Sequence, residues 1–369
     1  MLPPMDQAAR LPRLRDALKR PDGGAAPIDA LLVTSLTNIR YLTGFTGSAG
    51  MLFVFPGRTV LLTDGRYRTQ AGEQLAAAGV EAEIAVAAAA AQHDTAREIV
   101  EDLPVLGLEA AHVSWARQRA FAETWFPRTE LVPTVGMVER LRRVKDAGEI
   151  ARIAEACRIA DAALGNLRDR LTKEPAEAEF GRELDFEMRR LGATGPSFET
   201  IVASGANAAK PHHRPDDTRV TANAPVVIDF GALVDGYCSD MTRTVWTGRL
   251  DDPTLRRAVE VVLASQAAGV AAVRAGVAAS DVDKACREVI ADAGWADAFV
   301  HGTGHGVGLD IHEAPSVAAS STDTLEPGHV VTVEPGVYLP GLGGVRIEDT
   351  VVVTEDGCRP LTNTPKDTP

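Results

Sequence analysis

Two aspartates lie on strands that the sequence predicts to be neighbours in one hairpin. The two-residue turn signal Asp235-Gly236 sets a register in which Asp229 lies opposite Thr242. Asp240 is then the diagonal neighbour of Asp229 on the same side of the ribbon, roughly 5–8 Å away. Because Asp229 is embedded in an apolar run, its carboxylate requires a nearby cation or a raised pKa. The alternative is an edge-strand aspartate that faces water.

A histidine-containing segment, HGTGHGVGL at 301–309, has glycine at every second position. In an extended chain His301, Thr303 and His305 share one face, and the glycines on the other face let a backbone or a ligand approach closely. The dinucleotide-binding pattern G-x-G-x-x-G is excluded because Val307 and Leu309 stand where its last glycine is needed. The segment favours a ligand site with His305 as the first candidate, and a purely structural histidine is the alternative.

Two further acids complete the set of candidates. Glu334 ends an apolar strand, and Glu348 shares one face of another strand with Arg346. Each glutamate alone could be a solvated surface residue. The set is more informative because all its members lie on or next to predicted strands: Asp229, Asp240, His305, Glu334 and Glu348.

Four carboxylates and one imidazole are mostly hard oxygen ligands. Such a set suits Mn²⁺, Mg²⁺ or a similar divalent ion better than zinc held by thiolates or several histidines. One ion does not neutralise four carboxylates, whereas two divalent ions do. Paired ions roughly 3.5–4 Å apart lower the pKa of a water between them and stabilise a tetrahedral intermediate. The residues therefore indicate hydrolase chemistry.

The sequence gives little support for other kinds of catalytic site. The sequence has no G-x-S-x-G nucleophile elbow, and no cysteine lies near the histidine-rich segment. The four cysteines are far apart and form no C-x-x-C pair: Cys157, Cys238, Cys286 and Cys358. Reduced thiols in a cytoplasmic protein are therefore expected, rather than a disulfide framework or a thiolate zinc site.

The length and net charge of the chain limit the classes of protein to which it can belong. A chain of 369 residues is expected to form two domains. Its net charge of −13 argues against a nucleic-acid or anionic-membrane surface, which needs clustered positive charge. The sequence has no apolar stretch of membrane-spanning length, and its first residues lack the apolar core of a secretory signal.

Residues 1–135 are predicted to form a small α/β domain, and residues 136–369 mix helices with strands rich in Val, Ile and Thr. The alanine run at 85–91 is expected to be a helix or its flank. Asp146 and Glu149 have capping-box spacing at the start of a helix. The other predicted elements are helices at 67–78, 94–103, 146–172, 175–192, 253–275 and 280–293, and strands at 28–34, 51–55, 60–64, 198–203, 225–232, 237–247, 328–334 and 344–353.

Together these motifs resemble the creatinase/aminopeptidase P branch of the pita-bread metallopeptidases. The strings that carry the resemblance are VVIDFGALVDGYCSDMTRT, HGTGHGVGLDIHEAP, TVEPGVYLPGLGGVRIEDTVVV, VASGANAAKPHH and YLTGFTGS. The resemblance implies an α+β chain in which a creatinase-like α/β domain (1–135) precedes a pita-bread catalytic domain (136–369). It also implies a homodimer.

The resemblance further implies roles for individual residues. Asp229 would bind one metal, His305 and Glu334 the other, and Asp240 and Glu348 would bridge both. Mn²⁺ is the expected ion, with Co²⁺ or Zn²⁺ as alternatives, and a bridging hydroxide would attack the peptide, with Glu334 handling its proton.

The remaining implied residues face the substrate. His212 and His312 would be the catalytic histidines on the substrate side, and Arg346 a substrate-binding arginine beside the bridging glutamate. The sequence departs from the family at His212-His213-Arg214, where a single histidine followed by a small residue is usual, so His213 is an alternative to His212. His213, His301 and His329 are otherwise expected to be surface or packing residues.

The implied activity is hydrolysis of the bond between an N-terminal residue and proline, as in an Xaa-Pro aminopeptidase. An Xaa-Pro dipeptidase acting on dipeptides is the alternative, and the sequence does not separate the two. Methionine aminopeptidase is a further rival because it shares the five ligands. A metal-free creatinase-like hydrolase and a non-catalytic binding module both predict lost ligands, whereas all five are present.

Overall fold

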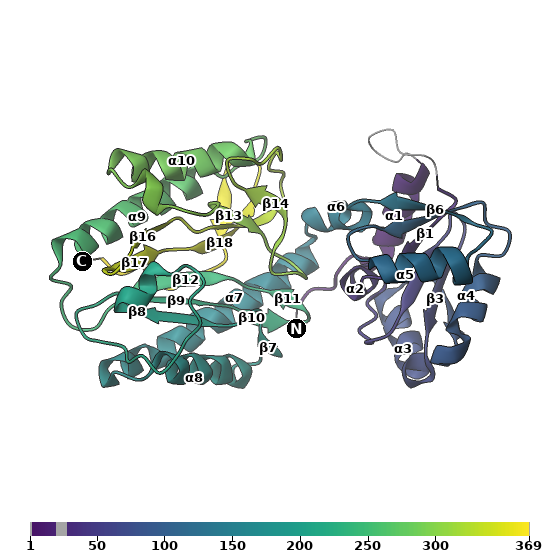
Figure 1. The fold of residues 1–369 in the computed structure, drawn as a ribbon, viewed down its shortest axis with the longest axis horizontal. Coiled ribbons are helices and arrows are strands. Elements are labelled where there is room, and N and C mark those ends of the chain that lie inside the picture. The colour runs from purple at the N-terminus through teal and green to yellow at the C-terminus, as the bar shows by residue number, and fades with distance from the viewer. Residues whose placement is uncertain (1, 20–27, 369) are drawn as a thin grey trace. The chain divides into compact units, whose positions relative to one another are not determined.

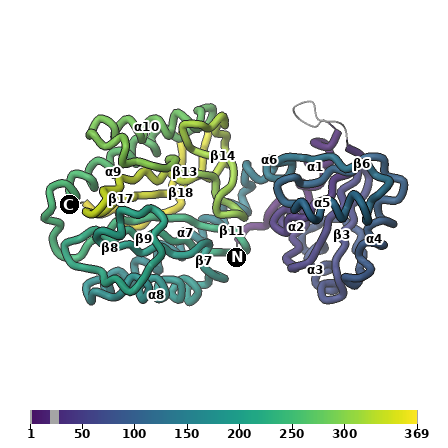
Figure 2. The backbone as a smooth tube through the Cα atoms, in the orientation of Figure 1, coloured from purple at the N-terminus to yellow at the C-terminus, as the bar shows by residue number. Residues whose placement is uncertain are grey.

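The computed structural model describes residues 2–19 and 28–368. Its contacts divide the chain into two compact units, Met5–Arg142 and Arg143–Pro369 with Met1–Pro4 (Figures 1 and 2). The domain boundary expected near residue 136 falls at the start of helix α6 (Met137–Arg143) and stays a prediction. None of the helices described is long and apolar enough to cross a membrane.

The first unit is a six-stranded sheet in the order β4-β3-β2-β1-β5-β6, with parallel pairs β1–β5, β5–β6 and β3–β4. Helices lie along both faces of this sheet (Figure 1). Its strands are β1 (Ala30–Val33), β2 (Met51–Val54), β3 (Thr59–Thr63), β4 (Glu83–Val86), β5 (Val105–Glu109) and β6 (Glu130–Thr134), and its helices include α1 (Arg10–Lys19), α2 (Leu36–Thr43), α3 (Arg68–Ala78), α4 (Gln92–Ile99) and α5 (Trp115–Ala120).

The alanine-rich stretch differs from expectation at its beginning. Ala85 and Val86 belong to strand β4, and only Ala89–Ala91 form a short 3₁₀ turn before α4. Ala85 pairs with Leu62 of β3 in a parallel ladder. Sheet pairing therefore overrides the helical preference of alanine in the first part of the run.

The second unit has two halves, each with one main sheet covered by a pair of helices (Figure 1). Two smaller sheets, β11-β10-β7 and β16-β17, complete the unit. One half packs α7 and α8 on the sheet β12-β9-β8, and the other packs α9 and α10 on β14-β13-β15-β18-β19. The elements are α7 (Ala147–Leu167), α8 (Glu177–Arg190), β7 (Gly195–Pro196), β8 (Ile201–Ser204), β9 (Val226–Phe230), β10 (Ala232–Val234), β11 (Tyr237–Cys238), β12 (Met241–Val245), α9 (Pro253–Ala272), α10 (Ala279–Asp292), β13 (Gly304–Gly306), β14 (Glu313–Val317), β15 (Val330–Val333), β16 (Gly336–Leu339), β17 (Gly343–Arg346), β18 (Asp349–Val353) and β19 (Cys358–Pro360).

The expected start of α7 is confirmed. Asp146 accepts a hydrogen bond from the Glu149 backbone N–H (2.9 Å), and the Glu149 carboxylate accepts one from the Asp146 N–H (3.0 Å). This capping box supplies acceptors for backbone donors that the first turn of a helix leaves free. The α-helix ends at Leu167 rather than at residue 172, because the chain tightens into a 3₁₀ helix over Arg168–Lys173.

The predicted hairpin register is also confirmed. Asp229 on β9 pairs with Thr242 on β12, and the turn residues Asp235 and Gly236 have φ values of 46° and 77°. Positive φ at both positions is the backbone of a type I′ turn. The ribbon is interrupted midway: β10 and β11 belong to a different sheet from β9 and β12, and Asp240 lies in the interruption before β12.

Candidate metal centre

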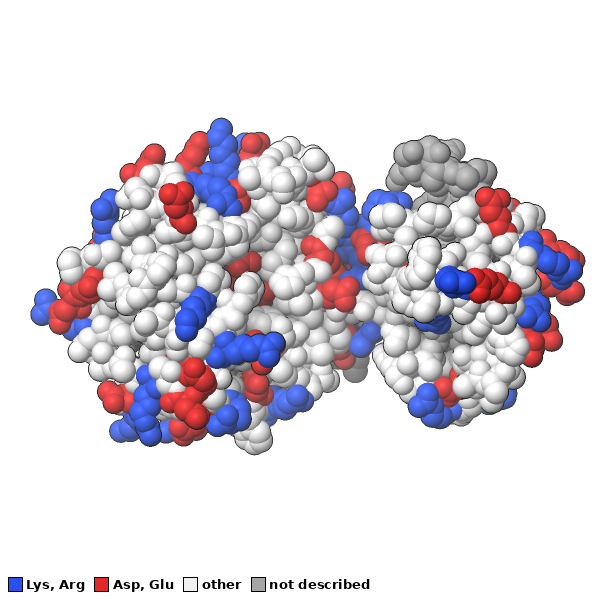
Figure 3. All heavy atoms as spheres, in the orientation of Figure 1, with Lys and Arg blue, Asp and Glu red and all other residues white. Residues whose placement is uncertain are grey.

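The five candidate ligands line one cavity of about 510 Å³ in the second unit. They come from both of its halves, β9 and the β11–β12 junction on one side and β13, the end of β15 and the β17–β18 junction on the other. Acidic atoms are visible within the recess of this unit in Figure 3. The lining includes Asp229, Asp240, His305, Glu334 and Glu348.

Asp240 and Glu348 occupy equivalent places in their strands. Each lies where the chain leaves one sheet and enters another, between β11 and β12 and between β17 and β18. The Glu348 backbone N–H donates to the carbonyl oxygen of Thr242, so the two junctions lie side by side. A strand junction frees a side chain from the alternation of the ladder, and here it directs two buried acids into one space.

Asp229 is held by a buried arginine. Arg346 Nη2 donates to Asp229 Oδ2 at 2.5 Å, and the other donors of this guanidinium bind Thr242 Oγ1 and Tyr338 Oη. Asp229 Oδ1 is buried with no hydrogen-bond partner among the described residues. Since Arg346 fixes the carboxylate through one oxygen, the other is left for a ligand.

Glu348 has the same arrangement. Thr242 Oγ1 donates to Glu348 Oε2 at 2.7 Å, whereas Glu348 Oε1 is buried and has no partner in the described chain. An unpartnered carboxylate oxygen in the interior is costly unless a cation or a proton binds it.

His305 and Glu334 form the third part of the site. His305 Nε2 lies 3.3 Å from Glu334 Oε1 and 3.5 Å from Asp240 Oδ2. Its Nδ1 is 3.0 Å from the carbonyl oxygen of Gly306, an arrangement that places a proton on Nδ1 and directs Nε2 toward the acids. Thr332 Oγ1 accepts from the His305 N–H and donates to Glu334 Oε1, so one hydroxyl orients both side chains.

Close packing around β13 explains its glycines. A Cβ atom at Gly304 would lie 2.1 Å from the carbonyl oxygen of Thr332, and one at Gly306 would lie 2.5 Å from that of Ala314. Both distances are too short for any side chain, so glycine is required where β14 and β15 flank His305.

Electrostatics of the site favour a bound cation. Burial raises the pKa of Asp240 and Glu348 well above the usual values, and the surrounding carboxylates raise both further. Burial also raises the pKa of Asp229 against the opposing charge of Arg346. For Glu334, the hydrogen bond and charge of His305 outweigh burial, and the pKa is lowered. A bound cation would offset the repulsion between these ionised carboxylates and the cost of burying their charges.

The ligand atoms of this site are therefore suited to divalent metal ions. The donors are four carboxylates and one imidazole, and two of the buried carboxylate oxygens have no partner in the part of the chain that the structure describes. The ligand atoms of Asp240, His305 and Glu348 lie within 4.8 Å of one another. Mostly oxygen donors suit hard divalent ions.

The histidines expected on the substrate side separate into two environments. His212 and His312 line the cavity and are exposed, and the His312 ring packs edge-on against His305 with centroids 4.3 Å apart. Burial and the nearby His305 lower the pKa of His312. His213 also borders the cavity but is buried, with Nε2 2.6 Å from Glu177 Oε2. This geometry favours His212 over His213 as the residue that faces a substrate.

One residue of the cavity lining could not be assigned from the sequence. His301, expected to be a packing residue, lines the cavity with its Nε2 2.8 Å from Tyr338 Oη. Tyr338 in turn accepts from Arg346 Nη1, so a chain of hydrogen bonds joins His301 to Asp229. The spacing of His301 and His305 on one face was the signal that could have identified it.

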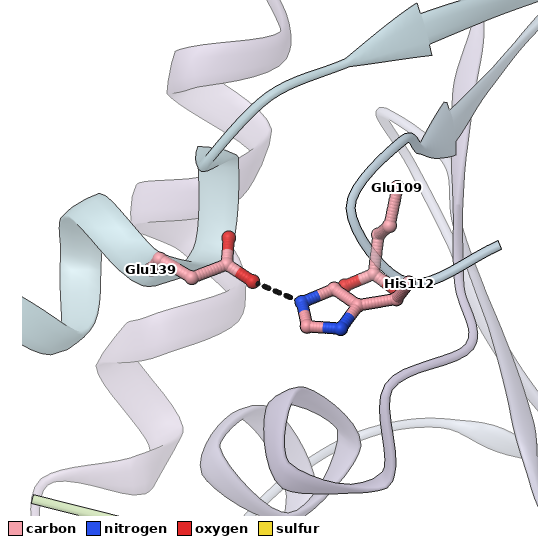
Figure 4. A group of neighbouring side chains, drawn as sticks. All are labelled: Glu109, His112 and Glu139. Carbon is pink, nitrogen blue, oxygen red and sulfur yellow. Dashed lines mark hydrogen bonds and ion pairs between the residues drawn. The ribbon is translucent and has the colours of Figure 1, made fainter. Parts of the chain in front are cut away.

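A second group of potential metal ligands lies in the first unit (Figure 4). Asn38 Nδ2 donates to both Glu109 Oε1 and Glu139 Oε1, and Glu109 Oε2 accepts from the Thr34 N–H. His112 Nε2 lies 2.8 Å from Glu139 Oε1. Because protein donors already bind these carboxylates, the group holds helices α2 and α6 to the sheet without needing a cation.

The second unit has two helix-covered halves around an acidic, histidine-containing cavity, and a smaller α/β unit precedes it in the chain. This combination defines a pita-bread metallohydrolase with a creatinase-like N-terminal domain. Comparison with known families agrees: residues 151–355 match metallopeptidase family M24, and residues 10–144 match the creatinase/prolidase N-terminal domain. The chain belongs to metallopeptidase family M24, in its creatinase/aminopeptidase P branch, and is an enzyme. The expected fold class is thereby confirmed.

Relatives and solved structures extend over almost the whole chain. The uncharacterized peptidase YqhT of Bacillus subtilis (strain 168) is 40% identical over 346 residues, which cover 93% of this chain and 96% of that protein. The Xaa-Pro dipeptidase from Bacillus anthracis has a TM-score of 0.91 at 38% identity, covering 98% and 99% of the two chains. The X-Pro aminopeptidase from Thermotoga maritima MSB8 has a TM-score of 0.85 at 33% identity, covering 92% and 97%.

Proposed function

We propose that this chain is a dinuclear metal-dependent exopeptidase that hydrolyses the bond between an N-terminal residue and proline. The observation that carries the proposal is the convergence of five metal-ligand side chains on one cavity, with Asp229 Oδ1 and Glu348 Oε1 buried and unpartnered among the described residues. The names of the similar structures, a dipeptidase and an aminopeptidase for Xaa-Pro substrates, support proline as the second residue.

The proposed ligands are those expected from the sequence, and Mn²⁺ is the proposed ion, with Co²⁺ or Zn²⁺ as alternatives. When bound, a pair of divalent ions supplies Lewis acidity, which polarises a carbonyl group and lowers the pKa of water. Asp240 and Glu348, at the two neighbouring strand junctions, would be ligands shared by the two ions, and Arg346 orients Asp229 through their 2.5 Å contact. The donors of Arg346 bind protein atoms, which supports a positioning role for this residue beside the substrate-binding role that the resemblance implies.

The proton is handled by Glu334 in this proposal. Its Oε1 contacts His305 and accepts a hydrogen bond from Thr332 Oγ1, and these contacts orient the carboxylate. The second oxygen, Oε2, can take a proton from the attacking water and deliver it to the prolyl nitrogen as the bond breaks. His212 and His312 line the same cavity and can donate hydrogen bonds to the tetrahedral intermediate.

Proline suits such a site for a simple reason. A prolyl amide has no N–H, so a peptidase that relies on backbone pairing on both sides of the bond handles it poorly. A site that polarises the carbonyl directly has no such dependence. The proposed activity is that of an aminopeptidase acting on longer peptides, with a dipeptidase as the alternative, and the sequence alone does not separate the two.

The test uses protein purified without metal. Cleavage of Xaa-Pro dipeptides and Xaa-Pro-Yaa tripeptides is measured before and after stepwise addition of Mn²⁺, Co²⁺ or Zn²⁺. The proposal predicts no cleavage without metal, recovery on addition, and no cleavage of matched peptides with alanine in place of proline. Xaa-Pro cleavage that survives exhaustive chelation would refute it.

A further inference from the structure

An exposed arginine lines the catalytic cavity beside the histidines that face it. Arg214 follows the pair His212-His213, and its side chain is 83% exposed. Its one ion-pair partner among the described residues is Glu199, also on the cavity lining, with Nη2 3.4 Å from Glu199 Oε2 and 66% of that side chain exposed. Such solvated pairs add little to stability, so the guanidinium is free to exchange its partner.

Arg214 differs from the other arginine of the cavity. Each of the three guanidinium nitrogens of Arg346 donates to a protein oxygen, on Thr242, Tyr338 or Asp229. Arg214 and Arg346 are the only Lys or Arg side chains among the described lining residues. Arg214 is therefore the one permanent cation of the described lining that a substrate can reach.

The backbone that carries Arg214 is anchored on both sides of His212. The carbonyl oxygen of Pro211 accepts from Arg346 Nη1, and buried His213 binds the fully buried Glu177 at 2.6 Å. Glu177 also accepts from the Ser204 N–H, which ties this loop to strand β8. The anchors hold the backbone of residues 211–213, so Arg214 extends from a fixed point on the rim of the cavity, while its exposed guanidinium can change partner.

We propose that Arg214 is a specificity-determining residue that binds the free α-carboxylate of an Xaa-Pro dipeptide. This inference rests on the proposed function and selects its dipeptidase alternative. In a dipeptide the carboxylate is attached to the proline ring beside the scissile nitrogen, whereas in a longer peptide that position is an uncharged amide. Five acids line the cavity, and the proposed ions would neutralise only the four that are metal ligands. A carboxylate that enters beside the fifth, Glu199, is stabilised by a cation, and a guanidinium binds it through two parallel hydrogen bonds.

Glu199 has a defined part in this arrangement. It competes with the substrate carboxylate for the Arg214 guanidinium and adds a like charge beside it. Glu199→Gln therefore strengthens dipeptide binding, in the direction opposite to removal of Arg214. A longer peptide, which has no carboxylate at this place, gains nothing from either interaction.

The experiment compares Ala-Pro, Ala-Pro amide and Ala-Pro-Ala as substrates of the metal-loaded enzyme. Arg214→Gln is expected to lower kcat/KM for Ala-Pro by about 10- to 100-fold, mainly through KM, and to leave the amide and the tripeptide within about twofold. Glu199→Gln is expected to lower KM for Ala-Pro alone. Arg249→Gln, which removes a similarly exposed ion pair with Asp251 away from the cavity, is the matched control and leaves all three substrates unchanged.

Several outcomes overturn the inference. An equal loss on all three substrates would show that Arg214 has no role in carboxylate recognition, and an unchanged KM for Ala-Pro would show that it does not bind that group. A selective loss on the tripeptide would place the carboxylate one residue farther along. If the unaltered enzyme cleaves none of the Xaa-Pro substrates, the proposed function itself fails and the inference falls with it.

Discussion

Removing one buried hydroxyl should weaken the metal centre without touching a proposed ligand. Thr242 is fully buried, and its Oγ1 donates to Glu348 Oε2 at 2.7 Å and accepts from Arg346 Nε at 3.1 Å. Thr242→Val keeps the shape of the side chain but removes both contacts. Since Glu348 Oε1 has no partner among the described residues, the variant leaves this carboxylate without any side-chain hydrogen bond.

The magnitude follows from these contacts. A hydrogen bond to a charged group contributes about 1.5–3 kcal/mol, and loss of an outer-shell partner lowers metal affinity by about 10- to 100-fold. The ionised form of Glu348, already disfavoured by burial, becomes less stable still in the variant, and this is the form that binds a cation. We therefore expect Thr242→Val to weaken metal binding by about 10- to 100-fold.

Calorimetric titration of metal-depleted protein with Mn²⁺ measures this effect directly. Thr242→Ser is the matched control because it keeps the hydroxyl and should retain most of the affinity. The reasoning fails if Thr242→Val binds Mn²⁺ as tightly as the unaltered protein does, or if Thr242→Ser is equally impaired.

Two further predictions concern stability. Lys145 Nζ and Glu313 Oε1 form a buried ion pair at 2.7 Å. Lys145→Met should therefore lower the free energy of unfolding, measured in urea, by about 3–5 kcal/mol, and the added substitution Glu313→Gln should recover part of that loss. An unchanged free energy of unfolding in Lys145→Met would contradict this prediction. Burial and the charge of Lys145 lower the pKa of His329 to about 4. Because the unfolded histidine takes up a proton near pH 6.5, the free energy of unfolding should fall by up to about 3 kcal/mol from pH 6.5 to pH 4. His329→Asn keeps an acceptor for the Glu326 N–H and should flatten that part of the plot of unfolding free energy against pH.

Local sequence signals were sufficient where one turn or one cap determines geometry. The Asp235-Gly236 turn fixed the pairing of Asp229 with Thr242, and the spacing of Asp146 and Glu149 fixed the start of α7. These features depend on residues close together in the chain. The candidate ligands could be selected because buried carboxylates on apolar strands are rare without a partner.

Contacts between distant segments could not be read in the same way. The predicted strand 344–353 is two strands, β17 and β18, in different sheets, and Glu348 enters the cavity because the chain changes sheet there. His301 looked like a packing residue because its partner Tyr338 lies far along the chain. The burial of His213 likewise depends on Glu177 from helix α8. Register and packing across elements decide these roles, and no local pattern contains them.

Metal stoichiometry tests the central claim most directly. Metal-depleted protein is saturated with Mn²⁺, freed of excess ion, and its metal content is measured by mass spectrometry, for the unaltered chain and for Glu348→Gln and Asp240→Asn. The account predicts two ions per chain in the unaltered protein and a loss of tightly bound metal in both variants. Full Mn²⁺ content in the two variants, or no tightly bound divalent ion in the unaltered chain, would contradict it.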